Sequence, residues 1–159
     1  MSRKQGNYKP RAVLGTPWGM TSPAPKAKVD RVMLRFLTAL DAMARGEHPG
    51  KAEWRDLSDA INTIETLALR RRKLNAAEAM PLVNAGIAAM VGAARRFSAG
   101  QSMRLDAAGL QAMRDVLDVY RQCLEGLSEF EMATAQAETQ RRMHQLLRSK
   151  KPSREVIAL

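Results

Sequence analysis

Few residues in this sequence have the types and spacing that catalysis or metal binding requires. The two histidines, His48 and His144, lie far apart, and neither has a cysteine or carboxylate at metal-ligand spacing. A di-metal site in a helical bundle needs Glu-x-x-His pairs, and the sequence contains none. Glu138 and His144 are six residues apart, so they do not share a helix face. We therefore expect no metal and no cofactor, and exposed or capping histidines.

Cys123 is the single cysteine and therefore the one candidate for a thiol nucleophile. A nucleophilic thiol needs a nearby base and a lowered pKa, and the sequence identifies no such base. Gly15 and Gly19 have the wrong spacing for a phosphate-binding loop, and no helix is expected after them. Cys123 is thus predicted to be a half-buried packing residue, and the protein is predicted not to be an enzyme.

Positive charge is the remaining chemical feature, and it is unevenly distributed. Of the formal net charge of +10, residues 1–29 contribute +6 without any acid, and residues 149–159 contribute +2. If all six cations of residues 1–29 met phosphates, affinity would fall with salt with a slope of about −5. The body, residues 30–148, contributes only +2, which is not typical of a dedicated nucleic-acid-binding domain.

Residues 1–29 are predicted to form an extended basic arm. Four prolines and three glycines disfavour a helix there, since proline lacks an amide donor and restricts the residue before it. The arm could bind nucleic acid through its cations, but Tyr8 and Trp18 suit binding in a groove of a partner protein equally well. A second cationic cluster ends a predicted helix, where cations also complement the helix dipole. The candidate partner-binding residues are Arg3, Lys4, Tyr8, Lys9, Arg11, Trp18, Arg70, Arg71, Arg72 and Lys73.

The elements that must position these residues are predicted to be helices throughout residues 30–148. Apolar residues recur every three or four positions, and alternating β-branched runs are absent. Expected helices cover 30–45, 51–74, a third segment that begins or kinks near Pro81 and ends at Ser98, a fourth after the N-cap Asp106, and a fifth from Glu129 through Leu147. Short connections favour an antiparallel bundle of about five helices, with residues 149–159 as a short basic tail.

Each expected helix has one apolar stripe, and together the stripes predict the core. The stripes are Met33, Phe36, Leu37, Leu40 and Met43; Trp54, Leu57, Ile61, Ile64, Leu67 and Ala68; Val83, Ile87, Met90 and Val91; Leu110, Met113, Leu117, Tyr120, Leu124 and Leu127. In the fifth helix, Met143 is predicted to fill the core. The fourth stripe is close to a heptad repeat, which leaves open pairing between chains. One cysteine, no apolar signal region and no long apolar run predict a cytoplasmic protein without a membrane span.

The sequence resembles small uncharacterised proteins carried by prophages and related mobile elements of proteobacteria. The similarity begins with Ser2-Arg3-Lys4 and Tyr8-Lys9-Pro10-Arg11 and continues through Ala60-Ile61-Asn62, Glu65 and the helical pattern after Val83. The sequence departs from this pattern in residues 16–28 and in its longer C-terminal tail. The resemblance implies a phage context, in which small accessory proteins often bind and block a host complex, including immunity complexes.

Three functions fit these observations. The first is a non-enzymatic interaction protein whose arm engages a host protein or ribonucleoprotein complex, with the helical body as a scaffold. The second is direct binding of nucleic acid through the arm and the 70–73 cluster. The third is an oligomeric assembly protein that pairs through the heptad-like stripe of the fourth helix.

Overall fold

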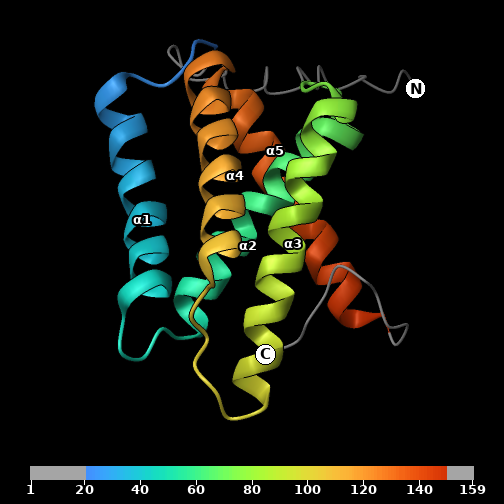
Figure 1. Ribbon diagram of the computed structural model, residues 1–159. Helices are drawn as coiled ribbons and strands as arrows, with labels where there is room; N and C mark the ends of the chain where they lie inside the picture. The colour runs from blue at the N-terminus through green and yellow to red at the C-terminus, as the bar shows by residue number, and fades with distance from the viewer. Residues whose placement is uncertain (1–20, 150–159) are drawn as a thin grey trace, which may run out of the picture.

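The computed structural model describes residues 21–149, which form five α-helices joined by short turns (Figure 1). The elements are α1 (Lys26–Arg45), α2 (Lys51–Glu65), the π-helical turn η1 (Thr66–Arg70), α3 (Ala76–Ser98), α4 (Ala107–Gly126) and α5 (Glu129–Arg148). No strand occurs within residues 21–149, so the predicted all-α class is confirmed. The arm residues 1–20 and the tail residues 150–159 lie outside the described part of the chain.

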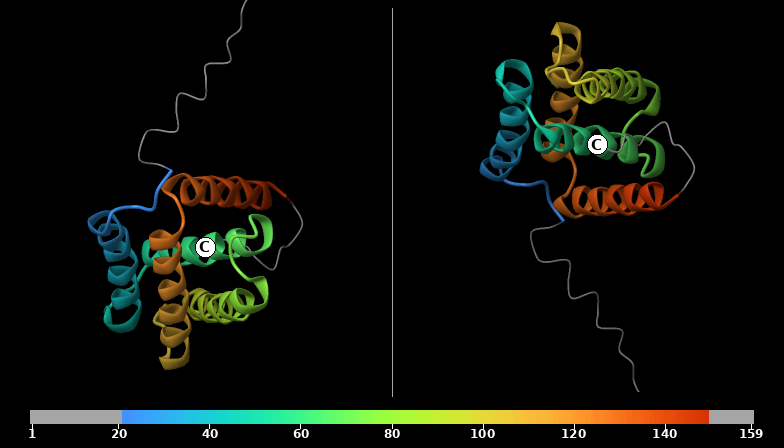
Figure 2. Two further views of the ribbon diagram at one scale, coloured as in Figure 1. Left: turned by 90° about the horizontal axis from the view of Figure 1, so that it is seen from above. Right: turned by 90° about the horizontal axis from the view of Figure 1, so that it is seen from below.

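The helix α2 runs through the middle of the molecule and touches all four other helices. Figure 2 shows α3 on one side of α2 and α5 on the other. This position explains why consecutive residues of its second half are buried around the whole helix, from Ala60 through the η1 residue Ala68, apart from a half-buried Asn62. A central helix surrounded by four others is the architecture that positions every site described below.

The core is filled by aliphatic side chains and methionines, with little aromatic area. Met33, Met43, Leu57, Ile64 and Met113 are each at most 2% exposed. Outside this set, Phe36 and Tyr120 meet edge to face, with ring centroids 4.9 Å apart and an interplanar angle of 66°. The predicted core stripes of α2 and α4 are confirmed for Leu57, Ile61, Ile64, Leu67, Ala68, Met113, Leu117, Tyr120 and Leu124.

Two core predictions differ from the structure. Leu37 is 44% exposed, because the buried face of α1 runs through Phe36, Ala39 and Leu40 instead. Met143 is only half-buried, since the buried face of α5 runs through Thr139 and Arg142. Both residues sit one position away from the buried helix face, which a three-or-four spacing rule does not resolve.

Two predicted boundaries also differ from the structure. The helix α1 begins at Lys26 and not at 30, because the Pro25 carbonyl accepts the Lys28 and Val29 amides and Val29 enters the core. The second helix ends at Arg70, four residues early, after widening into the π turn.

Of the two alternatives for the third helix, the start near Pro81 is wrong, because α3 begins at Ala76 and continues through Pro81. Its start is set by the N-cap Asn75, whose side-chain oxygen accepts the Ala77 amide at 3.1 Å and whose amide donates to Glu78 at 2.8 Å. The predicted caps Asp106 and Ser128 are both confirmed, the latter as a full capping box with Glu131.

Candidate partner-binding surface

The predicted cationic cluster, residues 70–73, begins with the last residue of the widened turn η1 and contains one residue with a strained backbone. In η1 the Arg71 amide donates to the Thr66 carbonyl at 3.0 Å, five residues back, and the Lys73 amide donates to Leu67 at 2.9 Å. These bonds wrap the chain around Arg72, whose φ of 51° is the one positive value of a non-glycine residue within 21–149. The turn therefore holds Arg72 in the left-handed region that helix ends usually fill with glycine.

The four cations of this cluster do not share one environment. Arg71 Nε lies 2.8 Å from Glu138 Oε2, and Lys73 Nζ lies 2.5 Å from Glu131 Oε1, so α5 engages both. Arg70 and Arg72 are exposed and form no ion pair with the described residues. All four predicted contact residues are thus exposed, but two of them also form ion pairs that hold a helix of their own chain.

A buried polar seam continues this interface between α2, η1 and α5. Glu65 and Arg142 form an ion pair in which both residues are less than a tenth exposed. Beside it, the hydroxyl oxygens of Thr66 and Thr139 lie 2.8 Å apart. Arg142 Nε is buried without a hydrogen-bond partner within the described residues. Sequence reasoning missed this seam, although Glu65 within an apolar stripe and Arg142 in phase with Met132, Ala135 and Thr139 were available signals.

The described residues at the end of the arm, Ser22 to Lys28 (the root of the arm), contact the first turn of α5. The Ser22 carbonyl accepts the Glu129 amide at 2.9 Å, and Lys28 forms an ion pair with the Glu129 side chain. Two residues later, Glu131 pairs with Lys73. The first turn of α5 therefore connects the root of the arm to the 70–73 cluster, and Figure 1 shows these segments together at the upper end of the bundle. Arg3, Lys4, Tyr8, Lys9, Arg11 and Trp18 lie outside the described residues.

Glu131 is the most strongly perturbed carboxyl of this end. The Lys73 ammonium, and after it the amide and hydroxyl of Ser128, lower the pKa of Glu131 from 4.5 to about 2. The side chain consequently stays ionised at neutral pH, where it accepts the Ser128 amide at 3.0 Å and caps α5. One carboxylate thus both starts α5 and fastens it to the cluster.

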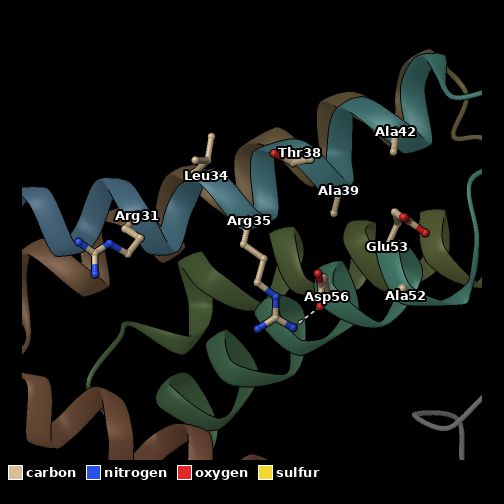
Figure 3. Close-up of a pocket in the computed structure, with 9 residues that line it drawn as sticks. All are labelled: Arg31, Leu34, Arg35, Thr38, Ala39, Ala42, Ala52, Glu53 and Asp56. Atoms are coloured by element: carbon tan, nitrogen blue, oxygen red, sulfur yellow. Dashed lines mark hydrogen bonds and ion pairs between the residues drawn. The ribbon is translucent and has the colours of Figure 1, made fainter.

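A shallow groove of about 380 Å³ lies between α1 and α2 (Figure 3). It is lined by Arg31, Leu34, Arg35, Thr38, Ala39, Ala42, Ala52, Glu53 and Asp56. Arg35 crosses it to pair with Asp56, and the Glu53 carboxylate accepts the Gly50 amide at 2.9 Å. Leu34 is 64% exposed at its edge. The groove has a floor of small alanines and carries no cluster of reactive groups.

The residues considered for catalysis or metal binding are dispersed. Cys123 is 3% exposed, more buried than predicted, and burial raises the pKa of its thiol to about 11, so the thiol is neutral at pH 7. His48 and His144 are exposed, as predicted. Within residues 21–149, no three His, Cys, Asp or Glu side chains lie close enough together to hold a metal ion.

The helix α3 is long and apolar enough to cross a membrane by length and composition. In this structure it packs against α2 and α4 and buries Val83, Met90 and Ala93 between them.

No protein-family model, no curated protein and no solved structure matches this chain.

Proposed function

We propose that this chain is a non-enzymatic interaction protein, an accessory factor of a phage or mobile element that acts in the host cytoplasm. Its basic arm and the exposed cations Arg70 and Arg72 engage a host protein or ribonucleoprotein complex. The helical body presents these groups, and binding blocks or redirects the complex by occupying a surface. The arm residues Arg3, Lys4, Tyr8, Lys9, Arg11 and Trp18 supply cations and aromatic anchors.

The observation that carries this proposal is the junction at the first turn of α5. Ser22 at the root of the arm and Lys73 at the end of the cluster both contact this turn, through Glu129 and Glu131. A partner that meets the arm therefore meets the cluster on the same end of the molecule. If the arm and the 70–73 cluster lay at opposite ends of the molecule, one partner could not contact both at a single surface.

The backbone of Arg72 gives further support. Glycine relieves the strain of a positive φ, so an arginine at this position lowers stability relative to glycine. An exposed guanidinium held in this conformation, without an ion pair to the described residues, is suited to contact another molecule. Strain of this kind clusters at ligand-contacting sites in proteins.

A pull-down from proteobacterial lysate tests the proposal. The baits are the full chain, a deletion of residues 1–20, and the double variant Arg70→Ser/Arg72→Gly. The deletion stops at residue 20 because Ser22 helps to hold α5. A matched control, Arg55→Ser/Arg114→Ser, removes two exposed cations elsewhere. We expect specific partners to be lost from the first two variants and kept by the control; identical partner lists for all baits would refute the proposal.

Direct binding of nucleic acid is the second candidate function, and the acid-free run of cations in the arm favours it. Nuclease treatment of the lysate separates the two: a partner retained after nuclease is held through protein. Mobility shifts with single-stranded and duplex DNA and RNA at low and high salt provide the direct test. A salt-sensitive shift that disappears with residues 1–20 supports nucleic-acid binding, and no shift at low salt excludes it.

Assembly through the fourth helix has less support. Met113, Leu117, Tyr120 and Leu124, the heptad-like stripe, are buried in the core of their own chain. They are therefore not free to pair with a second copy while the domain is folded. Light scattering at high protein concentration tests this, since a monomer would exclude constitutive assembly.

A further inference from the structure

The helix α5 is attached to the body in a different way from the other helices. Its buried residues are Met132, Ala135, Thr139 and Arg142, of which only the first two are apolar. The helix α1, of equal length, buries six residues, and all of them are apolar. Apolar burial thus holds α1 in place, whereas α5 rests on the polar seam along α2 and η1. Figure 2 shows α5 at one edge of the molecule, beside α2.

Ion pairs make up much of this attachment. Within the described residues, six ion pairs join different elements, and four of them involve α5. The four pairs are Lys28–Glu129, Lys73–Glu131, Arg71–Glu138 and Arg142–Glu65. Three of these have a cation that is at least a third exposed, and only the fourth is buried on both sides. The three exposed pairs are open to screening by salt and to exchange with other anions.

We propose that α5 is an electrostatic latch that forms ion pairs with half of the cationic cluster and is released when a polyanionic surface takes Arg71 and Lys73. In the free protein, the carboxylates of Glu138 and Glu131 occupy these two cations. Arg70 and Arg72, which form no ion pair with the described residues, make the first contact. The neighbouring cations then exchange the α5 carboxylates for the anions of the partner.

The consequence is a regulated form of the proposed binding surface. Docked α5 leaves two cluster cations without an ion pair to the described residues, and released α5 frees the other two from their carboxylates, so a partner gains ion pairs by opening the latch. The buried Glu65–Arg142 pair is screened least and is the last tie to break. The identity of the partner rests on the proposed function, but the latch itself can be tested without any partner.

Hydrogen exchange of the full chain at about 0.05 M and about 0.5 M NaCl measures the latch directly, since screening lengths differ severalfold between them. We expect α5 amides to exchange about tenfold faster at the higher salt, with α2 and α3 amides unchanged. Equal protection of α5 at both salt concentrations would overturn the proposal.

Neutralising the α5 carboxylates should reproduce the effect of salt. The triple variant Glu129→Gln/Glu131→Gln/Glu138→Gln keeps side-chain size, and glutamine at 131 retains the capping bond to Ser128. We expect its α5 to exchange rapidly at both salt concentrations. The control Glu47→Gln/Asp118→Asn neutralises two exposed acids that form no ion pair with the described residues, and it should behave as wild type.

A charge swap guards against simple misfolding of the triple variant. Arg71→Glu places two carboxylates together and should release α5, and adding Glu138→Arg restores an opposite-charge pair at the same place. Recovery of α5 protection in the double variant supports the latch, because a general loss of stability would not be rescued. Absence of recovery contradicts it.

Heparin serves as the polyanion in the last part of the experiment. Heparin that binds at low salt and accelerates α5 exchange supports competition for Arg71 and Lys73. Heparin that binds without affecting α5 overturns the competition step. Failure of heparin to bind removes the polyanion from the proposal, while the salt-dependent exchange of α5 still decides whether the latch exists.

Discussion

Arg72 occupies a position at the end of a helix where the backbone favours glycine. Its φ of 51° follows from the π turn before it, which carries the chain past the normal end of an α-helix. Arg71 and Lys73, on either side, form ion pairs with α5, while Arg72 is exposed and forms no ion pair with the described residues. At this residue, backbone strain and an available charge coincide.

Replacing Arg72 with glycine should stabilise the protein by about 1 kcal/mol, because glycine adopts positive φ without the steric cost. Urea unfolding measures the change. The control is Arg70→Gly, which removes a neighbouring cation from a helical backbone and should destabilise by about 1 kcal/mol. Equal effects of the two substitutions would contradict the strain at Arg72.

The buried pair Glu65–Arg142 predicts a strong asymmetry between single and double substitutions. Glu65→Gln leaves the Arg142 charge buried without its counter-ion and should cost about 3–5 kcal/mol in unfolding free energy. The double variant Glu65→Leu/Arg142→Met removes both charges and should recover most of that loss. Denaturant unfolding of the three proteins tests this, and a double variant as unstable as the single one would contradict it.

At the scale of the elements, local signals were predictable and distant ones were not. The caps Asp106 and Ser128 bond to amides within three residues, so the sequence around them contains the whole interaction. The π turn at Thr66 lies against Thr139 and beside the Glu65–Arg142 pair, whose members are 77 residues apart. Sequence patterns among neighbouring residues therefore do not predict which distant residue will pack against this turn.

The candidate partner-binding surface was also predictable only in part. The Arg70–Lys73 cluster was visible as a run of basic letters, but the run does not reveal that Glu131 and Glu138 engage two of its members. That division depends on where α5 packs, which the weak apolar stripe of α5 specifies poorly. The all-α fold itself was predictable, because apolar residues recur at helical spacing along the chain and most members of the α2 and α4 stripes are buried in the core.

A close helix crossing gives a prediction at this scale. A Cβ atom on Gly86 of α3 would lie 3.1 Å from Val116 Cγ2 of α4 and 3.2 Å from Ile61 Cδ1 of α2. Gly86→Val should therefore push these helices apart and destabilise the protein by about 1–3 kcal/mol. Thermal unfolding measures the loss. Gly126→Val is the control against the branched side chain itself, since a Cβ there meets no atom within 4 Å.

For the whole molecule, the attachment of α5 predicts a partial transition in acid. Glu131 has its pKa lowered from 4.5 to about 2, so its stabilising contribution is complete above pH 4.5 and is lost as the pH falls toward 2. The apolar contacts of α1 to α4 do not titrate. We expect α5 to lose exchange protection in this window before the other helices.

Hydrogen exchange at several pH values, corrected for the intrinsic exchange rate, measures this order of events. Glu131→Gln should weaken the pH dependence of α5 protection, because the substituted side chain does not titrate in this range. Simultaneous loss of all five helices would show that the domain unfolds as one unit and that α5 is not separately attached.

The Ser128–Glu131 capping box also bears on how the chain is made. Of the buried core residues that the structure describes, only Met132 and Ala135 follow residue 128, so a ribosome delivers α1 to α4 with nearly all of the core first. The cap then lets the last helix begin from residues of its own first turn, without waiting for a distant contact. An α5 formed in this way would close onto a body whose four helices have already been synthesised.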